Sequence, residues 1–433
     1  MNTKKLYPLN EQFVHYLWLT QAFSKEMLLC DTGETVCIYN QGFENHNSGP
    51  DFGAAKIKIG DMVWNGNVEI HTRSSDWRRH RHHEDQAYDS VILHVVWAHD
   101  QQVTRTDGTV VPTIELKKRV SHNTLLNYRN LINKSGDIAC SDQLPDLDKM
   151  ILFNLLDRMA INKLQDKVGA IEGLLKLSKN NWEETAFLLL CNNLGFKVNS
   201  APFSLLGRSI PYNLLRKYRS NLFQVEALLF GAAGFLDDYL NDPYHTRLRT
   251  EHHFLVKKHG YDTVLEKTQW KFHRLRPANF PTIRIAQLAS IIHHNHNLFS
   301  LLLNTNNFRE LQQPFSYPPS SYWLSHYNFG KPSKKVNSTL GKAGLENIII
   351  NTLSPLVFTY GQRTENKRFC EKAVNLLQGI PAENNRIIRK WNTHLGSPCK
   401  TAFDSQALIF LYNNYCINKK CLACDIGKTL LKK

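Results

Sequence analysis

The apolar run Val91-Ile92-Leu93-His94-Val95-Val96-Trp97 constrains the fold more than any other stretch of the chain. Nearly every position in it is apolar, which predicts a strand that is buried on both faces. Such a strand needs neighbouring strands on its edges and helices on its faces. Candidate strands are residues 35–39, 54–59, 62–64, 67–71 and 109–116, the last at a sheet edge or start because it contains Pro112.

Two helices are predicted around these strands. Residues 10–29 have apolar side chains at roughly helical spacing, and Asn10 is a suitable N-cap. Ser75-Asp76 is a good start for a short, very polar helix that ends near Tyr88. The order of helix, three strands, helix and one or two strands predicts a mixed α/β sheet with helices on its faces.

After residue 120 helical periods replace the alternation of strands. The sequence therefore predicts an α/β domain over residues 1–125 and a larger all-α domain over residues 126–433. A subdivision of the second domain near residue 320 is an open alternative, because residues 313–333 are rich in proline, serine and tyrosine and read as a loop.

Charge and composition narrow the class of protein. Hydrophobic residues make up 42% of the chain, as in ordinary globular proteins, and the net charge is +15. An excess of this size favours a polyanionic partner, most simply nucleic acid, with DNA favoured over RNA; solubility alone is the alternative. The start of the chain lacks the pattern of an export signal, no segment has the length of a membrane span, and the nine cysteines do not suggest a disulfide framework. We therefore expect a cytoplasmic protein without membrane contact, and the sequence leaves its oligomeric state open.

The densest group of acidic and basic side chains lies between Ser48 and Asp100. Asp51 stands at the head of a predicted strand, and Glu69 and His71 share one face of another because residues i and i+2 of a strand point the same way. Two carboxylates that converge repel each other unless a cation lies between them, and Mg²⁺ or Mn²⁺ suits such a pair. His71 could then orient the attacking water.

This pattern resembles that of the PD-(D/E)XK nuclease superfamily. In that superfamily a Pro-Asp at a strand start is followed by an acid, any residue and a lysine on the next strand. Here Pro50-Asp51 is followed, after 17 intervening residues, by Glu69-Ile70-His71, so histidine stands in place of the usual lysine. The resemblance implies a restriction-endonuclease-like sheet, a Mg²⁺ or Mn²⁺ ion held by Asp51 and Glu69, and hydrolysis of phosphodiester bonds. Many members also carry an acid on the first helix, which here would be Glu11.

Two alternatives to a nuclease remain open from the same residues. One is a non-catalytic nucleic-acid-binding or scaffold protein with a degenerate nuclease core. The other is a metal-dependent hydrolase of a small substrate. The whole chain also resembles an uncharacterised family of about this length, through Gly49-Pro50-Asp51-Phe52, residues 66–71 and Ser75-Asp76-Trp77.

A cluster of histidines and arginines follows the acidic motif. In one interpretation Arg73, Arg78, Arg79 and Arg81, with His80, contact the phosphates of a nucleic acid. In a second, His71 and His80 bind zinc or manganese with Asp85 or His94. In a third the cluster is a solvated basic helix face, and His94, inside its apolar strand, is a core histidine.

Four of the nine cysteines fall in the last 35 residues: Cys399, Cys416, Cys421 and Cys424. Cys421-Leu422-Ala423-Cys424 has the two-residue spacing of a metal-binding turn, and two further thiolates complete a four-sulfur set. The sequence predicts a structural site for zinc or a [4Fe–4S] cluster over residues 399–424, with packed free thiols as the alternative.

Overall fold

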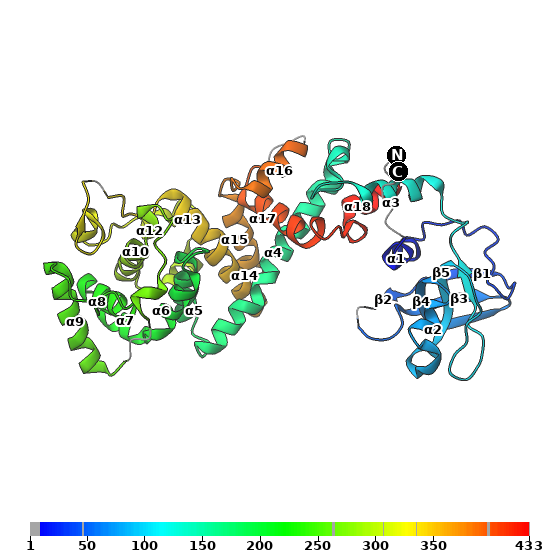
Figure 1. Ribbon diagram of the computed structural model, residues 1–433, viewed down its shortest axis with the longest axis horizontal. Coiled ribbons are helices and arrows are strands. Elements are labelled where there is room, and N and C mark those ends of the chain that lie inside the picture. Colours follow the sequence, from blue (N-terminus) through cyan, green and yellow to red (C-terminus); the bar gives the residue numbers. More distant parts are fainter. Residues whose placement is uncertain are drawn as a thin grey trace. The chain divides into compact units, whose positions relative to one another are not determined.

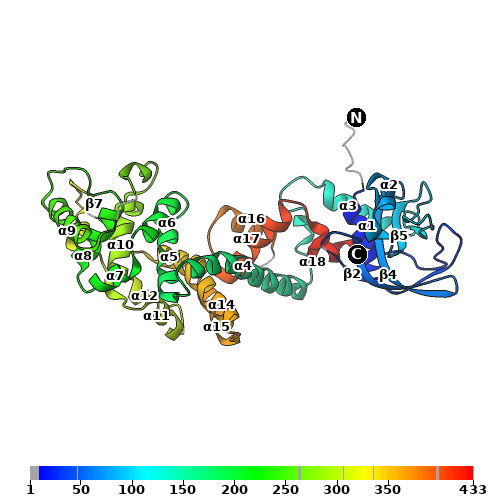
Figure 2. The same cartoon turned by 90° about the horizontal axis from the view of Figure 1, so that it is seen from below.

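The computed structural model describes residues 9–45, 47–261, 265–305, 307–334, 336–395 and 399–432. Residues 1–8, on which the expectation of a missing export signal rests, lie outside the described residues. The chain forms two compact units (Figures 1 and 2). The first contains residues up to Leu155, a short piece that begins at Thr393, and the segment from Leu411 onward; the second contains Leu156–Asn392 and the residues up to Phe410.

A mixed six-stranded sheet forms the centre of the first unit, as the sequence predicts. Its strands are β1 (Val36–Asn40), β2 (Phe43–Glu44), β3 (Phe52–Ile59), β4 (Met62–Arg73), β5 (Val91–Ala98) and β6 (Thr113–Glu115). The order is β1-β3-β4-β5-β6, with β2 paired to β3. Strands β3 and β4 form an antiparallel hairpin, whereas β4, β5 and β6 run parallel. The apolar strand β5 therefore has a neighbour on each edge, and the predicted strands 62–64 and 67–71 are one continuous strand.

The first helix covers one face of this sheet (Figure 1). Helix α1 (Glu11–Thr20) is capped as expected, because the Asn10 side chain accepts a hydrogen bond from the Phe13 N–H at 3.2 Å. Its buried residues, Phe13 and Leu17 among them, join the core formed by the sheet. The helix ends well before residue 29, because Gln21 adopts a left-handed conformation with φ 52°.

The prediction of one polar helix from residue 76 to 88 was wrong. Helix α2 has only four residues, Asp76–Arg79, and two single 3₁₀ turns follow, His82–Glu84 and Gln86–Tyr88. The chain leaves the helical path at Arg81, whose φ of 62° lies in the left-handed region. This break turns His82 inward, where its ring stacks on Tyr88 with 3.7 Å between the ring centroids.

The C-terminal segment packs within the first unit. Helix α18 (Asp425–Lys432) contacts helix α3 (His122–Asn133), and the two lie side by side in Figure 1. Leu431 belongs to the same core as Phe13, and Leu422 packs against that core. The Asn127 side chain also donates a hydrogen bond to the carbonyl of Leu430 at 3.3 Å. Residues that the sequence grouped with the helical domain are thus part of the first unit.

The second unit is mostly helical, as expected, with one two-stranded hairpin inside the stretch that the sequence predicted to be a loop. The long helix α4 (Lys149–Leu177) begins in the first unit and continues into the second. The other elements are α5 (Trp182–Leu194), α6 (Ser200–Ser209), α7 (Tyr212–Tyr218), α8 (Leu222–Ala232), α9 (Pro243–His259), α10 (Pro281–His294), α11 (Leu298–Asn304), α12 (Gln312–Phe315), β7 (His326–Asn328), β8 (Lys331–Pro332), α13 (Lys342–Ile348), α14 (Ser354–Arg363), α15 (Lys367–Gln378), α16 (Arg386–His394) and α17 (Ala402–Leu411).

Candidate metal centre

Asp51 comes directly before β3, and Glu69 lies next to it in β4. The pairing of Phe52 with Val68 in the β3–β4 hairpin places the two acids in adjacent strands. The Asp51 N–H donates a hydrogen bond to Glu69 Oε2 at 3.0 Å, and the Ile70 N–H donates one to Asp51 Oδ2 at 2.9 Å. Each carboxylate is therefore fixed by the backbone of the other strand.

Two histidines lie near the second oxygen of Glu69, and a third lies beside one of them. His82 Nε2 lies 3.3 Å and His71 Nε2 lies 3.7 Å from Glu69 Oε1. His80 Nδ1 lies 3.1 Å from His71 Nε2. One nitrogen of each of the three rings falls within 4.8 Å of the others. Three imidazoles and one carboxylate form a donor set that suits a transition metal such as zinc or manganese.

A fourth histidine supports this group from the neighbouring strand. His94 is paired with Glu69 in the β4–β5 register, and its Nε2 lies 2.9 Å from His71 Nδ1. It is fully buried, as the sequence suggested for a core histidine. If His71 donates its Nδ1 proton to His94, its Nε2 is left free to bind a metal. His94 thus fixes the tautomer that a metal ligand requires.

Burial disfavours the charged forms of Glu69 and of three of the histidines. Burial, and next the charge of Asp51, raises the pKa of Glu69 to about 9. Burial, and next the neighbouring His94, lowers the pKa of His71, while burial lowers that of His94 to about 3 and also lowers that of His82. A divalent cation would replace the proton of Glu69 and would find the buried imidazoles already neutral.

Helix α1 contributes two further groups, Glu11 and His15. They are four residues apart and so share a face of the helix. His15 Nε2 lies 3.4 Å from Asp51 Oδ2. Burial acts to lower the pKa of His15, but the hydrogen bond and charge of Asp51 outweigh it, so that the pKa is raised overall. Burial, and next the charge of Asp51, also raises the pKa of Glu11.

The predicted basic residues lie at the surface beside the cluster. Arg73, Arg78, Arg79 and Arg81 are all exposed. Arg79 forms an ion pair with Asp76 at 2.9 Å, and its charge contributes to the lowered pKa of His71.

Some predicted site residues lie together and others do not. Asp51, Glu69, His71, His80 and the helix residue Glu11 form one region. Asp85, proposed as a metal ligand, is exposed, and its carboxylate caps the turn at Ala87. His82 and His15 were missed as site residues. The spacing of Glu11 and His15 on one helix was the available signal for His15, whereas nothing local marks His82, which turns inward only because the helix breaks.

The cysteines are grouped differently from the sequence prediction. Cys416, Cys421 and Cys424 line a common cavity, and their fourth neighbour there is Cys140. Cys399 is not among the residues that line it. That cysteine belongs to the second unit, where its Sγ donates to the carbonyl of Thr401 at 3.7 Å.

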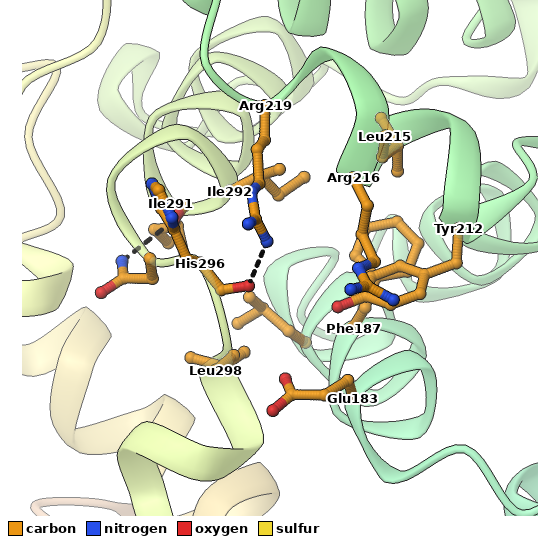
Figure 3. A pocket seen from close by; sticks show the side chains of 12 residues that line it. Glu183, Phe187, Tyr212, Leu215, Arg216, Arg219, Ile291, Ile292, His296 and Leu298 are labelled. Atoms are coloured by element: carbon orange, nitrogen blue, oxygen red, sulfur yellow. Dashed lines mark hydrogen bonds between the residues drawn. The ribbon is translucent and has the colours of Figure 1, made fainter.

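A pocket in the second unit offers charged groups that already have structural roles (Figure 3). Arg219 Nη1 donates to the carbonyl of His296 at 2.8 Å, the dashed line at the centre of the view. Glu183 accepts hydrogen bonds from the backbone N–H groups of Phe299 and Ser300, at 2.9 Å each, in the first turn of α11. Arg219 thus holds the link between α10 and α11, and Glu183 holds the start of α11.

The sequence matches a family model described as a protein of unknown function (DUF2851) over residues 11–386. The chain belongs to the DUF2851 family. The part matched to DUF2851 includes all the residues of the metal cluster and Cys140, and ends before Cys416. Searches of curated proteins and of solved structures return no match. Among its described residues, this DUF2851 protein has no helix with the length and apolar character of a membrane span.

Proposed function

We propose that the first unit is a metal-dependent nuclease that hydrolyses phosphodiester bonds, with DNA favoured over RNA. One observation carries the proposal: a buried carboxylate, Glu69, lies against two members of a histidine triad, His71 and His82, and beside a second acid, Asp51. Charged and polar groups are costly to bury without a function, and this set has the composition of a metal site. The exposed arginines beside it and the net charge of +15 support a polyanionic substrate.

The donor set favours Mn²⁺ or Zn²⁺ over Mg²⁺. Mg²⁺ prefers oxygen ligands and keeps several waters, whereas imidazole nitrogens suit the transition metals. One nitrogen each of His71, His80 and His82 would hold the ion, and Glu69 Oε1, next to His71 and His82, is the carboxylate beside them. The bound ion would lower the pKa of a coordinated water and draw charge from a phosphate oxygen.

Asp51 and His15 are placed to move the protons of the reaction. As the water oxygen bonds to phosphorus and the ester P–O bond breaks, Asp51 accepts the proton of the water. The leaving oxygen takes a proton from His15, whose raised pKa favours the protonated ring. Exposed Arg78 and Arg81 would hold the flanking phosphates.

The resemblance to the PD-(D/E)XK superfamily is part of this proposal. It is supported by the position of Asp51 directly before β3 and of Glu69-Ile70-His71 within the next strand. Histidine in place of lysine removes a permanent positive charge, and the histidine cluster explains the change, because a neutral imidazole can bind a metal that an ammonium group cannot.

The proposal is tested by cleavage assays on the metal-free full chain with Mn²⁺, Zn²⁺ or Mg²⁺ added back. Single- and double-stranded DNA and RNA serve as substrates. We expect Mn²⁺ to support cleavage and Glu69→Gln to reduce the rate by about 10²-fold or more, since even outer-shell changes cost about 10–100-fold. Asp61→Asn, at an exposed acid of the β3–β4 turn, is the matched control and should keep full activity. Equal cleavage by Glu69→Gln and the unmodified protein would overturn the assignment.

The histidine triad gives a second candidate, a zinc-dependent hydrolase of a small substrate. Three imidazoles and a carboxylate are common ligands in such enzymes. Metal-dependent turnover of a small phosphate ester or amide, without cleavage of any nucleic acid, would favour this candidate. Salt-sensitive DNA binding that survives in Glu69→Gln, without cleavage under any metal, would favour a non-catalytic binding protein instead.

A further inference from the structure

Four cysteines from distant parts of the sequence surround one cavity of the first unit. Cys140 follows helix α3, whereas Cys416, Cys421 and Cys424 belong to the C-terminal segment. The other lining residues are mostly apolar: Leu131, Ala139, Tyr415, Lys420 and Gly427. The cavity is partly open to solvent.

Polar contacts hold the two segments together around this cavity. The Tyr412 hydroxyl donates to Asp137 Oδ2 at 2.7 Å, and Lys419 Nζ donates to the carbonyl of Ile132 at 2.9 Å. Gly427 allows helix α18 to meet the turn before it, because a Cβ at that position would lie 2.0 Å from the carbonyl oxygen of Cys421. The arrangement of the four cysteines is thus built by the fold and does not depend on a single flexible contact.

The charges of these thiols affect the pKa values of neighbouring thiols, as expected for sulfur atoms that line one cavity. Burial raises the pKa of Cys416, and the charges of Cys140, Cys424 and Cys421 raise it further. Burial raises the pKa of Cys140 to about 12 and that of Cys421 to about 11. Cys424 is buried, and the other three thiols are partly buried. Four thiols that line one cavity supply the soft ligand set of a zinc site or an iron–sulfur cluster.

The distances between the sulfur atoms distinguish a site for one zinc ion from a site for a four-iron cluster. Four thiolates on one zinc ion, with Zn–S bonds of about 2.3 Å, lie about 3.8 Å from each other. Among the residues that the structure describes, no three of the four sulfur atoms lie within 4.8 Å of one another. A four-iron cubane carries its thiolate ligands on the corners of a wider tetrahedron, with one cysteine for each iron.

We infer that Cys140, Cys416, Cys421 and Cys424 bind a [4Fe–4S] cluster that joins the C-terminal segment to helix α3. Lys420, at the cavity, supplies positive charge next to a cluster whose four thiolates make it anionic. The cluster has a structural role, because it fixes the segment that packs against the core of helix α1. This inference does not depend on the proposed nuclease activity.

The test is the metal content of the full chain, purified or reconstituted with iron and sulfide without oxygen. We expect about four iron and four acid-labile sulfide per chain, with the broad visible absorption of a cubane and a paramagnetic signal after reduction. Iron and sulfide analysis of the unmodified protein does not require any variant to fold. About one zinc per chain after purification, or no iron and sulfide after reconstitution, would overturn the inference.

Two serine variants then identify the ligands. Cys140→Ser should lose most of the cluster, whereas Cys399→Ser, the matched control in the second unit, should retain it. Circular dichroism of both variants reports whether they fold. Full cluster content in Cys140→Ser would exclude Cys140 as a ligand and overturn the assignment.

Discussion

His94 is the buried residue that holds the central ring of the histidine cluster in place. It is fully buried, and in this structure it reaches His71 at 2.9 Å, the ring that stands at the centre of the cluster. A strand position surrounded by valine and leucine usually selects a packing residue. The bond between the two rings shows that a buried histidine can pack and also orient a neighbour.

We expect His94→Ala to weaken binding of Mn²⁺ or Zn²⁺ by about 10–100-fold, the usual cost of losing the partner of a metal-bound histidine. Titration calorimetry on the metal-free protein measures the affinity. His94→Gln keeps a hydrogen-bond acceptor for His71 and should lose less. If both variants bind metal like the unmodified protein, His94 has only a packing role; His122→Gln, on the exposed start of α3, is the control.

The segment between α2 and β5 is the element that decides which side chains join the histidine cluster. A regular helix over residues 76–88 would have placed His80 and Glu84 on one face. The break at Arg81 instead sends His82 into the cluster and leaves the arginines at the surface, while Glu84 pairs with His83 at 3.3 Å. One irregular segment thus places His82 beside Glu69 and leaves the neighbouring arginines exposed.

Arg78→Gln and Arg81→Gln should each weaken DNA binding at low salt. Each lost phosphate contact should also reduce the slope of log affinity against log salt by about 0.9. Fluorescence anisotropy with a labelled duplex at several salt concentrations measures this slope. Arg129→Gln, on the exposed side of α3, is the control. An unchanged slope in both Arg78→Gln and Arg81→Gln would show that neither arginine contacts the DNA phosphates.

At the scale of the whole molecule, a buried acid in the second unit makes stability depend on pH. Glu226 of α8 is fully buried and accepts hydrogen bonds from the hydroxyls of Tyr244 and Ser320. Burial raises its pKa from the ordinary value of 4.5 to about 7. The folded state therefore holds a proton that the unfolded state has lost, between about pH 4.5 and pH 7.

The contribution of Glu226 to stability is complete below pH 4.5 and is lost as the pH rises through 7. At 1.36 kcal/mol for each unit, the free energy of unfolding should fall by about 3 kcal/mol over this range. Urea unfolding of the full chain at several pH values measures the change. Glu226→Gln should flatten this dependence, and Glu371→Gln, an exposed acid of α15, should preserve it. The same slope in Glu226→Gln would show that another group is responsible.

The sequence alone predicted the structural features that depend on residues close together along the chain. The alternation of side chains located the strands and placed Glu69 and His71 on one face. The Pro50-Asp51 pair before β3 identified Asp51 as the acid beside these two residues. The N-cap at Asn10 was equally local. These features follow from the geometry of a strand or a helix turn, which fixes the direction of residues two to four positions apart.

Contacts between distant segments were decided only by the tertiary structure. The sequence chose Cys399 as the fourth sulfur because it is nearest along the chain, but folding brings Cys140 to the cavity from the end of α3. In the same way His15 reaches Asp51 from a helix, and His82 joins the cluster because Arg81 breaks the helical path. Packing of the core sets these distances, and no spacing along the chain encodes them. The sequence thus determined the sheet and the acidic motif, whereas tertiary packing decided which histidines join that motif and which cysteines share a cavity.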